Sequence, residues 1–376
     1  METLNPEDYS VIWIAPLEIE AQAALHMLDH RHNGRFPMGP GDDYVYQAGD
    51  MCGHNVAIVT LPGGQEYGTG SAAALTSQAK KFFPNFWFGL LVGVAAGIPD
   101  LGKESQRDIR LGDVLVSTSD TERSGIVAYD LGKDIGGDST KLLRHGHVLA
   151  QTETVVRSAI GSIKLDTPQE AYQFLPYYER MKNERHASGT FIDPGQNHDK
   201  FYQEGADGIE YAVERPERPV SERTRVWYGP IGSGEKNVRD AWKRDRLKKN
   251  LGIIGLEMAA AGIMNRIPVG VIMGVCNYAD KHADKIWKPY AAAMAAAYAK
   301  AVLFQIRPKP APNHPIPRGR EQYDTRTKSR RVKGYIDNSS VSNDNIIPGE
   351  RDISDDGNED APKRDRVIFN IGATKT

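Results

Sequence analysis

Short apolar runs alternate with helix-like segments over residues 11–306. Runs of roughly 4–8 apolar residues between turn formers are typical of buried strands, whereas apolar residues that recur every three or four positions are typical of helices. We therefore predict strands at 11–15, 44–49, 54–62, 87–98, 113–118, 125–130, 226–234 and 269–275. We predict helices at 17–28, 68–83, 148–160 and 287–304. The run at 87–98 is apolar on both faces, as the strands of a parallel sheet are.

Two segments depart from this alternation. Residues 132–225 are charged and rich in turn formers, and we interpret them as an elaborated insertion within one domain. A small second domain is the alternative. After Ile306 the chain becomes proline-rich, then basic at 326–333 and acidic at 350–361. Few apolar residues offset the entropy of ordering there, so we predict a disordered tail at 308–376. The basic run is typical of a solvated tail or of a nuclear-targeting or nucleic-acid patch.

The main domain is thus predicted to cover 11–307, after a lead-in at 1–10. The chain has 376 residues, 40% of them apolar, and a formal charge of -2, so no global charge favours nucleic acid or anionic membranes. No apolar run approaches the roughly 18 residues that span a bilayer. The acidic, polar N-terminus is not typical of a signal peptide. Cys52 and Cys276 form neither a disulfide framework nor a zinc motif, so we predict a cytoplasmic protein.

Two candidate stretches follow the first strands. Glu20 lies just past the strand at 11–15, where open α/β sheets bind ligands, and a carboxylate there can act as a general base on water. An ordinary exposed helix glutamate fits the same spacing. The stretch YGTGSAAA (67–74) is a glycine-rich turn into a helix, whose first amides can bind anions. It is neither a Walker loop nor a GxGxxG motif, and tight packing of the helix explains it equally well.

Three further stretches hold candidate chemistry. GVAAGIPD (93–100) places small residues, Gly97 among them, at a strand end, where a flat ligand can approach the backbone or the chain simply turns. Glu257 lies among apolar residues, so it needs a partner, either a ligand hydroxyl or a structural arginine. In GVCNYADKH (274–282), Asn277 ends a strand, and the acidic residues and histidine after it fit no standard ligand spacing. We therefore predict no metal site.

Taken together, these motifs resemble the purine and uridine phosphorylase superfamily, which includes the methylthioadenosine/S-adenosylhomocysteine nucleosidases, and within it a fungal branch. The motifs run in order over residues 9–305: WIAPLEIEAQAALHMLD, YGTGSAAALTSQ, FGLLVGVAAGIPD, DIRLGDVLVS, GIVAYDLGK, FIDPGQNHDKFY, YGPIGSGEKNVRD, GLEMAAAGIMN and NYADKHADKIWKPYAAAMAAAYAK. The resemblance implies an α/β fold, a three-layer αβα sandwich with a central mixed sheet, that forms homo-oligomers. It also implies cleavage of an N-glycosidic bond without a cofactor.

The resemblance assigns roles to individual residues. Glu20 falls where nucleosidases keep the glutamate that activates water. Glu257 and Met258 fall in the glutamate-methionine-glutamate motif that holds the ribose. Asn237 and the adjacent Val238 fall where many members place an aromatic ring over the base, and Gly97 belongs to the strand end that faces the ligand.

Three positions depart from the family pattern. Ala259 replaces the second ribose carboxylate, and Met273 stands where an arginine often orients the attacking group. Asn277 stands where an aspartate usually protonates the leaving base. An amide can donate a hydrogen bond to the base but cannot protonate it, and losing a general acid typically costs on the order of 10²–10⁴ in rate.

Two functions therefore compete. The first is cleavage of a purine nucleoside or nucleotide, even ATP, with basic groups supplied by the insertion; IAPLEIE resembles the nucleosidase form, so water is favoured over phosphate as the attacking group. The second is a catalytically weak or inactive sensor or scaffold that binds such a ligand. A dinucleotide-dependent oxidoreductase is disfavoured because no GxGxxG motif follows the first strand. We expect neither a membrane nor a nucleic acid as partner.

Overall fold

The computed structural model describes residues 2–64, 67–102, 106–120, 123–130, 132–134, 140–142, 149–205 and 207–309. These residues belong to one compact unit. The predicted tail, apart from its first two residues, lies outside the described residues, as does much of the first part of the predicted insertion. The predicted boundaries of the domain stay predictions.

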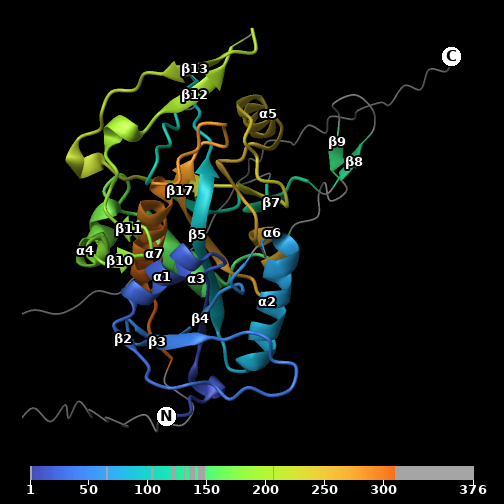
Figure 1. Cartoon of the computed structure of the whole chain (residues 1–376), viewed down its shortest axis with the longest axis vertical. Coiled ribbons are helices and arrows are strands. Elements are labelled where there is room, and N and C mark those ends of the chain that lie inside the picture. The colour runs from blue at the N-terminus through green and yellow to red at the C-terminus, as the bar shows by residue number, and fades with distance from the viewer. Residues whose placement is uncertain are drawn as a thin grey trace, which may run out of the picture. The chain divides into compact units, whose positions relative to one another are not determined.

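A mixed sheet forms the middle layer of this unit (Figure 1). Its strands, in spatial order, are β14 (Val226–Gly229), β6 (Val114–Ser117), β17 (Gly270–Asn277), β5 (Phe88–Gly97), β1 (Val11–Ile14), β4 (His54–Val59), β3 (Gln47–Met51) and β2 (His30–Arg31). Strands β4, β1, β5 and β17 run parallel, so their carboxyl ends meet at one edge of the sheet.

Three short strands extend the sheet beside β5. They are β16 (Gly255–Glu257), β15 (Ile231–Ser233) and β7 (Ile126–Ala128). Strand β16 pairs antiparallel with the end of β5, which brings the Glu257 segment next to the carboxyl end of that strand. The remaining strands form hairpins: β8 (Gly132–Asp134) with β9 (Thr140–Leu142), β10 (Arg185–His186) with β11 (Gly189–Thr190), and β12 (Phe201–Glu204) with β13 (Glu210–Val213).

Helices cover both faces of the sheet (Figure 1). One face carries α1 (Glu18–Met27), α3 (Thr154–Lys164), α4 (Ala171–Met181) and α7 (Trp287–Gln305). On the other side α2 (Thr69–Phe82) packs against α6 (Ala260–Ile263). Helix α5 (Ala241–Leu251) lies beside β12, and the 3₁₀ turns are η1 (Pro6–Asp8), η2 (Gln196–His198) and η3 (Val220–Glu222). The predicted αβα sandwich with a central mixed sheet is confirmed.

Helix α7 is the core element of its layer, and its alanines let it lie close to the sheet. Most of its residues are buried, from Trp287 to Leu303. A Cβ atom built on Gly274 of β17 would lie 1.9 Å from the Ala291 carbonyl oxygen of α7, so only glycine fits at this contact. This close packing fixes the start of α7 beside the end of β17.

Residues 185–225 are tied to the sheet by buried ion pairs. Arg218 lies 2.7 Å from Asp113, whose carboxylate also accepts a hydrogen bond from the Trp227 indole N–H. Arg215 pairs with Asp108, in the loop before β6, at 3.2 Å, and with Asp199 of its own segment at 3.0 Å. Because buried charges are costly unless paired, these contacts hold the described part of the predicted insertion against the domain.

Several predicted element boundaries were wrong. The helix predicted at 148–160 begins at Thr154 and ends at Lys164, and residues 143–148 lie outside the described residues. The strand predicted at 226–234 is two strands, β14 and β15, interrupted at Pro230, which has no N–H to donate to a ladder. Helices α4 and α5 were not predicted.

Candidate active site

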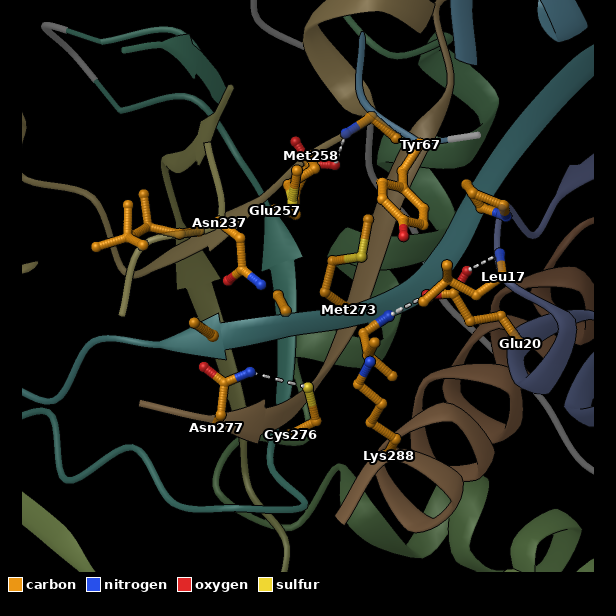
Figure 2. A pocket seen from close by; sticks show the side chains of 18 of the residues that line it. Leu17, Glu20, Tyr67, Asn237, Glu257, Met258, Met273, Cys276, Asn277 and Lys288 are labelled. Atoms are coloured by element: carbon orange, nitrogen blue, oxygen red, sulfur yellow. Dashed lines mark hydrogen bonds between the residues drawn. The ribbon is translucent and has the colours of Figure 1, made fainter. Parts of the chain in front are cut away.

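A cavity of about 340 Å³ opens at the carboxyl ends of β1, β5, β16 and β17 (Figure 2). Seven of the residues singled out from the sequence line it: Glu20, Asn237, Val238, Glu257, Met258, Met273 and Asn277. Gly97 does not line it. A Cβ atom on Gly97 would instead meet Val275 of β17 and Ile109 of the loop before β6 at 2.7 and 2.8 Å, so this glycine allows close packing there. The backbone that faces the cavity belongs to residues 93–96.

Glu20 is buried and fixed by two main-chain amides. One carboxylate oxygen accepts a hydrogen bond from the Leu17 N–H and the other from the Val94 N–H, both at 2.8 Å. Burial raises the pKa of Glu20 to about 7, although both amides and the Lys288 ammonium act to lower it. A carboxylate that titrates near neutrality is suited to take a proton from water.

The position of the Glu20 carboxylate against β5 depends on a glycine. A Cβ atom on Gly93 would lie 2.4 Å from one Glu20 carboxylate oxygen. Strand β5 therefore admits the carboxylate against its backbone only because residue 93 has no side chain. This is a local reason for the small residues that the sequence places in this strand.

Glu257 has one anchored and one free oxygen. Its Oε2 accepts hydrogen bonds from the Ala259 and Ala260 N–H groups at 2.7 and 2.9 Å. Its Oε1 is buried and has no hydrogen-bond partner among the described residues. Burial raises the pKa of Glu257, opposed by Ser233 and the two amides. A buried acceptor without a partner is costly, so this oxygen is available to a ligand hydroxyl.

Asn277 is oriented by the turn that follows it. Strand β17 shifts register between Val275 and Asn277, and such a bulge re-aims the side chains beside it. The Asn277 Oδ1 accepts a hydrogen bond from the Ala279 N–H at 2.9 Å. The side-chain NH₂ group lies 3.3 Å from the Cys276 sulfur, a weak acceptor. Asn277 therefore has its NH₂ group available to donate a hydrogen bond to a ligand in the cavity.

Glu20 and Asn277 face the cavity from opposite sides, with Met273 between them (Figure 2). Met273 is buried and Met258 half-buried, so they contribute apolar surface to the cavity wall. Burial raises the pKa of the Cys276 thiol to about 11, which keeps it protonated at neutral pH. This thiol is therefore not an activated nucleophile.

The sequence reasoning missed the cations of the cavity. Lys288, at the start of α7, is half-buried and lines the interior. Lys236, Arg239 and Lys285 line it as well but are exposed, and we call these three the rim cations. They come from the loops before α5 and α7, so the expectation that the insertion supplies the basic groups is wrong for the described residues. No motif in the sequence distinguishes these cations from ordinary surface lysines and arginines.

The amides that open α2 are occupied by the chain itself. The Glu235 carboxylate accepts hydrogen bonds from the Thr69 N–H at 2.8 Å and the Gly70 N–H at 3.2 Å, and from the Thr69 hydroxyl. The glycine-rich turn at 67–74 therefore holds an internal carboxylate in this structure, and Gly68 is needed for the close approach of that carboxylate.

Comparison with known proteins supports the fold and leaves the family open. No family model matches the sequence. A nucleotide-binding leucine-rich repeat (NLR)-like protein of Hyaloscypha variabilis is 36% identical over 320 residues, which cover 84% of this chain but 31% of that protein. The chain thus spans about a third of the length of the curated relative it matches.

Solved structures resemble the described domain. One is the 5'-methylthioadenosine/S-adenosylhomocysteine nucleosidase of Neisseria meningitidis in complex with methylthio-immucillin-A (TM-score 0.50, 16% identity, 79% of this chain and 99% of that one). Another is the futalosine hydrolase of Helicobacter pylori (TM-score 0.51, 14% identity, 80% and 99%). The chain has a nucleosidase-like fold. At this identity the likeness concerns the fold alone.

The described part of the chain contains neither a cluster of metal-binding side chains nor a membrane-spanning helix. No group of three or more histidine, cysteine, aspartate or glutamate side chains there could hold a metal ion. None of the helices described is both long and apolar enough to cross a membrane.

Proposed function

We propose that this chain cleaves the N-glycosidic bond of a purine nucleoside or nucleotide by hydrolysis. The observation that carries this proposal is the pair of buried carboxylates in one cavity. Glu20 has a pKa of about 7 and is held rigidly by two amides, while Glu257 presents an unpartnered oxygen. The first suits a base for water and the second suits a sugar hydroxyl.

In the proposed reaction a water molecule attacks the anomeric carbon of the ribose while Glu20 accepts its proton. The bond from that carbon to the base nitrogen breaks, and the electron pair leaves with the base. Glu257 accepts a hydrogen bond from a ribose hydroxyl, and Met258 packs against the sugar. Asn277 donates a hydrogen bond to the leaving base, which takes its proton from solvent.

The base lies, in this proposal, between Asn277 and the loop that carries Asn237 and Val238. Val238 is buried and apolar, as a wall for a flat ring should be. Asn237 is exposed, so it lies at the open side of the cavity. The predicted homo-oligomer and cytoplasmic location stay predictions.

The rim cations favour a phosphorylated ligand over an uncharged nucleoside. Among the described residues, the side chains of Lys236, Arg239 and Lys285 form no ion pair and no hydrogen bond, whereas Glu20 already has amide partners. Exposed cations at a cavity mouth attract anions and can pair with phosphate oxygens. We therefore expect nucleotides to bind more tightly than the corresponding nucleosides.

A second candidate function rests on the groups that the cavity lacks. Asn277 cannot protonate a base, Ala259 provides no second ribose carboxylate, and Met273 is not a cation. A cavity with Asn277, Ala259 and Met273 at these positions is suited to bind a nucleoside or nucleotide without cleaving it, as a sensor or scaffold does.

The deciding experiment measures release of free base. Purified protein is incubated with adenosine, inosine, guanosine, methylthioadenosine, uridine, AMP and ATP, with and without inorganic phosphate, and products are separated by chromatography. We expect base release that does not need phosphate and that the Glu20→Gln variant lacks. Release that persists in that variant identifies a contaminating enzyme. No release from any substrate contradicts hydrolysis and leaves the binding function, which thermal shift with the same ligands tests.

A further inference from the structure

The cavity holds two buried carboxylates and one interior cation. Glu20 and Glu257 both have raised pKa values because they are buried, and the charge of Glu257 further raises the pKa of Glu20. Within the described part of the chain, Lys288 is the cation whose side chain lines the interior rather than the rim. Figure 2 shows it reaching from the start of α7 into the space between Glu20 and Cys276.

Among the described residues, the Lys288 side chain forms no ion pair within 4.0 Å and no hydrogen bond. Its electrostatic partners face it across the cavity: it acts to lower the pKa of Glu20 and that of the Cys276 thiol. The start of a helix is itself electropositive, so Lys288 and the first turn of α7 contribute charge of the same sign. A lysine at the start of a helix is unfavourable for the helix itself, so we look for a role of Lys288 toward groups in other elements.

We propose that Lys288 is a positioning residue that keeps Glu20 ionised, so that Glu20 can accept a proton from water near neutral pH. Lys288 does this through space and transfers no proton. This inference rests on the proposed function, in which Glu20 is the base. It adds a residue from another element, α7, whose charge sets the pH range in which the cavity works.

The groups that act on the ionisation of Glu20 come from four parts of the chain. Strand β16 presents Glu257, which opposes ionisation of Glu20. Strand β17 presents the Cys276 thiol, which stays neutral near pH 7 because burial raises its pKa. Strand β5 and the β1–α1 loop present amides, which favour the ionised form without carrying a net charge. Lys288 on α7 is thus the full positive charge that offsets the effect of Glu257.

The test uses charge removal at Lys288 and reads the ionisation of Glu20. We expect Lys288→Met and Lys288→Gln to move the acidic limb of the kcat/KM profile upward by about one pH unit, the usual effect of losing one nearby opposite charge. At pH 6 this is roughly a 10-fold loss of activity, recovered near pH 9. Lys288→Arg should keep the limb in place. The matched control is Lys285→Met, which removes an exposed rim cation one turn away and should not move the limb.

A second readout does not need turnover. The Glu20 carboxyl is titrated by ¹³C NMR, its signal assigned by its absence in Glu20→Gln. We expect a titration near neutrality that shifts upward in Lys288→Gln and not in Lys285→Met. If the Glu20 titration shifts in Lys288→Gln but the protein releases no base, the role of Lys288 is supported. The lack of base release then contradicts only the proposed function. An unmoved Glu20 titration in both Lys288 variants, or a change confined to KM for phosphorylated ligands, overturns the inference.

Discussion

The amide at position 277 limits what the cavity can do to a leaving base. We predict that Asn277→Asp raises base release by about 10²-fold, because a carboxyl group can protonate the base and general-acid catalysis contributes on the order of 10²–10⁴. The turn should survive, since an aspartate oxygen can accept the hydrogen bond that the Ala279 N–H now gives to Asn277. Chromatographic initial rates on the best substrate measure the gain.

The matched control is Asn237→Asp, which puts the same carboxyl on an exposed amide of the same cavity. It should give no comparable gain. An equal rise in both variants would mean that added negative charge, and not a proton at position 277, is responsible. No rise in Asn277→Asp would show that departure of the base does not limit the rate.

Glu20 should leave a signature in the pH dependence of stability. Its pKa is about 7 in the folded chain and about 4.5 when unperturbed, so the folded state holds this proton more tightly. Stability from this group is therefore greatest below pH 4.5 and falls as the pH rises from 4.5 to 7, by up to on the order of 3 kcal/mol. We predict that Glu20→Gln flattens this fall, as measured by urea unfolding between pH 4.5 and 8.

The control for this prediction is Glu18→Gln, which changes an exposed glutamate on the same helix turn. It should leave the pH dependence as it is in the parent chain. Parallel curves for Glu20→Gln and the parent would mean that Glu20 ionises in the folded chain as it does in the unfolded one.

At the residue scale, the sequence reveals the site residues that follow strands and misses those that only folding brings in. Glu20 and Asn277 follow predicted strands, and parallel strand ends converge at one edge of a sheet. Gly97 shares that position in sequence, yet a side chain there would meet Val275 and Ile109 and not the cavity. Lys288 begins an alanine-rich helix, where a lysine ordinarily faces solvent, and only the packing of α7 on β17 turns it to the cavity.

At the element scale, the close packing of α7 on β17 sets the distance between the cavity walls that these two elements form. We predict that Gly274→Ala destabilises the fold by at least about 1–3 kcal/mol, because the new Cβ would lie 1.9 Å from a backbone oxygen that cannot rotate away. Both α7 and β17 carry cavity residues, so ligand binding should weaken with it. Urea unfolding measures the loss.

Gly161→Ala serves as the control at this scale. Gly161 lies inside α3, and a Cβ atom there would meet nothing within 4 Å. Alanine favours a helix interior over glycine by about 0.8–1.0 kcal/mol, so this variant should be more stable than the parent. A Gly274→Ala protein as stable as the parent would show that α7 can move away from the strand without loss.

Buried strands were predictable here, and a polar helix was not. Strands β5 and β17 are apolar on both faces and stand out in any window. Helix α5 has few apolar residues, so periodicity gave no signal, although its ends are marked: the Asp240 side chain accepts from the Lys243 N–H, and Gly252 adopts a left-handed conformation. Those capping residues are the sequence signal that could have found it.

At the scale of the whole molecule, the order of the motifs along the chain predicts the fold. The contacts that anchor residues 185–225 could not be predicted from the sequence. The ion pairs that tie this segment to the rest of the domain join distant residues: Arg218 and Asp113 are separated by 105 residues, and each alone resembles a surface charge. Spacing rules act within an element, so such pairs emerge only when the chain is folded.

One of these anchors reaches the turn that follows Asn277. Arg215 donates hydrogen bonds to Asp199 at 3.0 Å and to the Tyr278 hydroxyl at 2.8 Å, and the hydroxyl also holds Asp199. Tyr278 directly follows Asn277. Arg215, a residue of the predicted insertion, does not line the cavity but supports the turn that orients Asn277.

We predict that Arg215→Met destabilises the fold by about 3–5 kcal/mol, because it leaves the buried Asp199 carboxylate without its cation. Pairing it with Asp199→Asn should recover much of this loss, since the stranded charge is removed. Arg225→Met, which breaks an exposed pair with Glu222, should cost about 0–1 kcal/mol. Hydrogen exchange should show faster opening of residues 193–223 and of the turn at 277–280 together in Arg215→Met. If residues 193–223 loosen while the turn stays protected, the brace does not reach Asn277, and the turn is held by its other contacts, such as the hydrogen bond from Arg244 to the Tyr278 carbonyl.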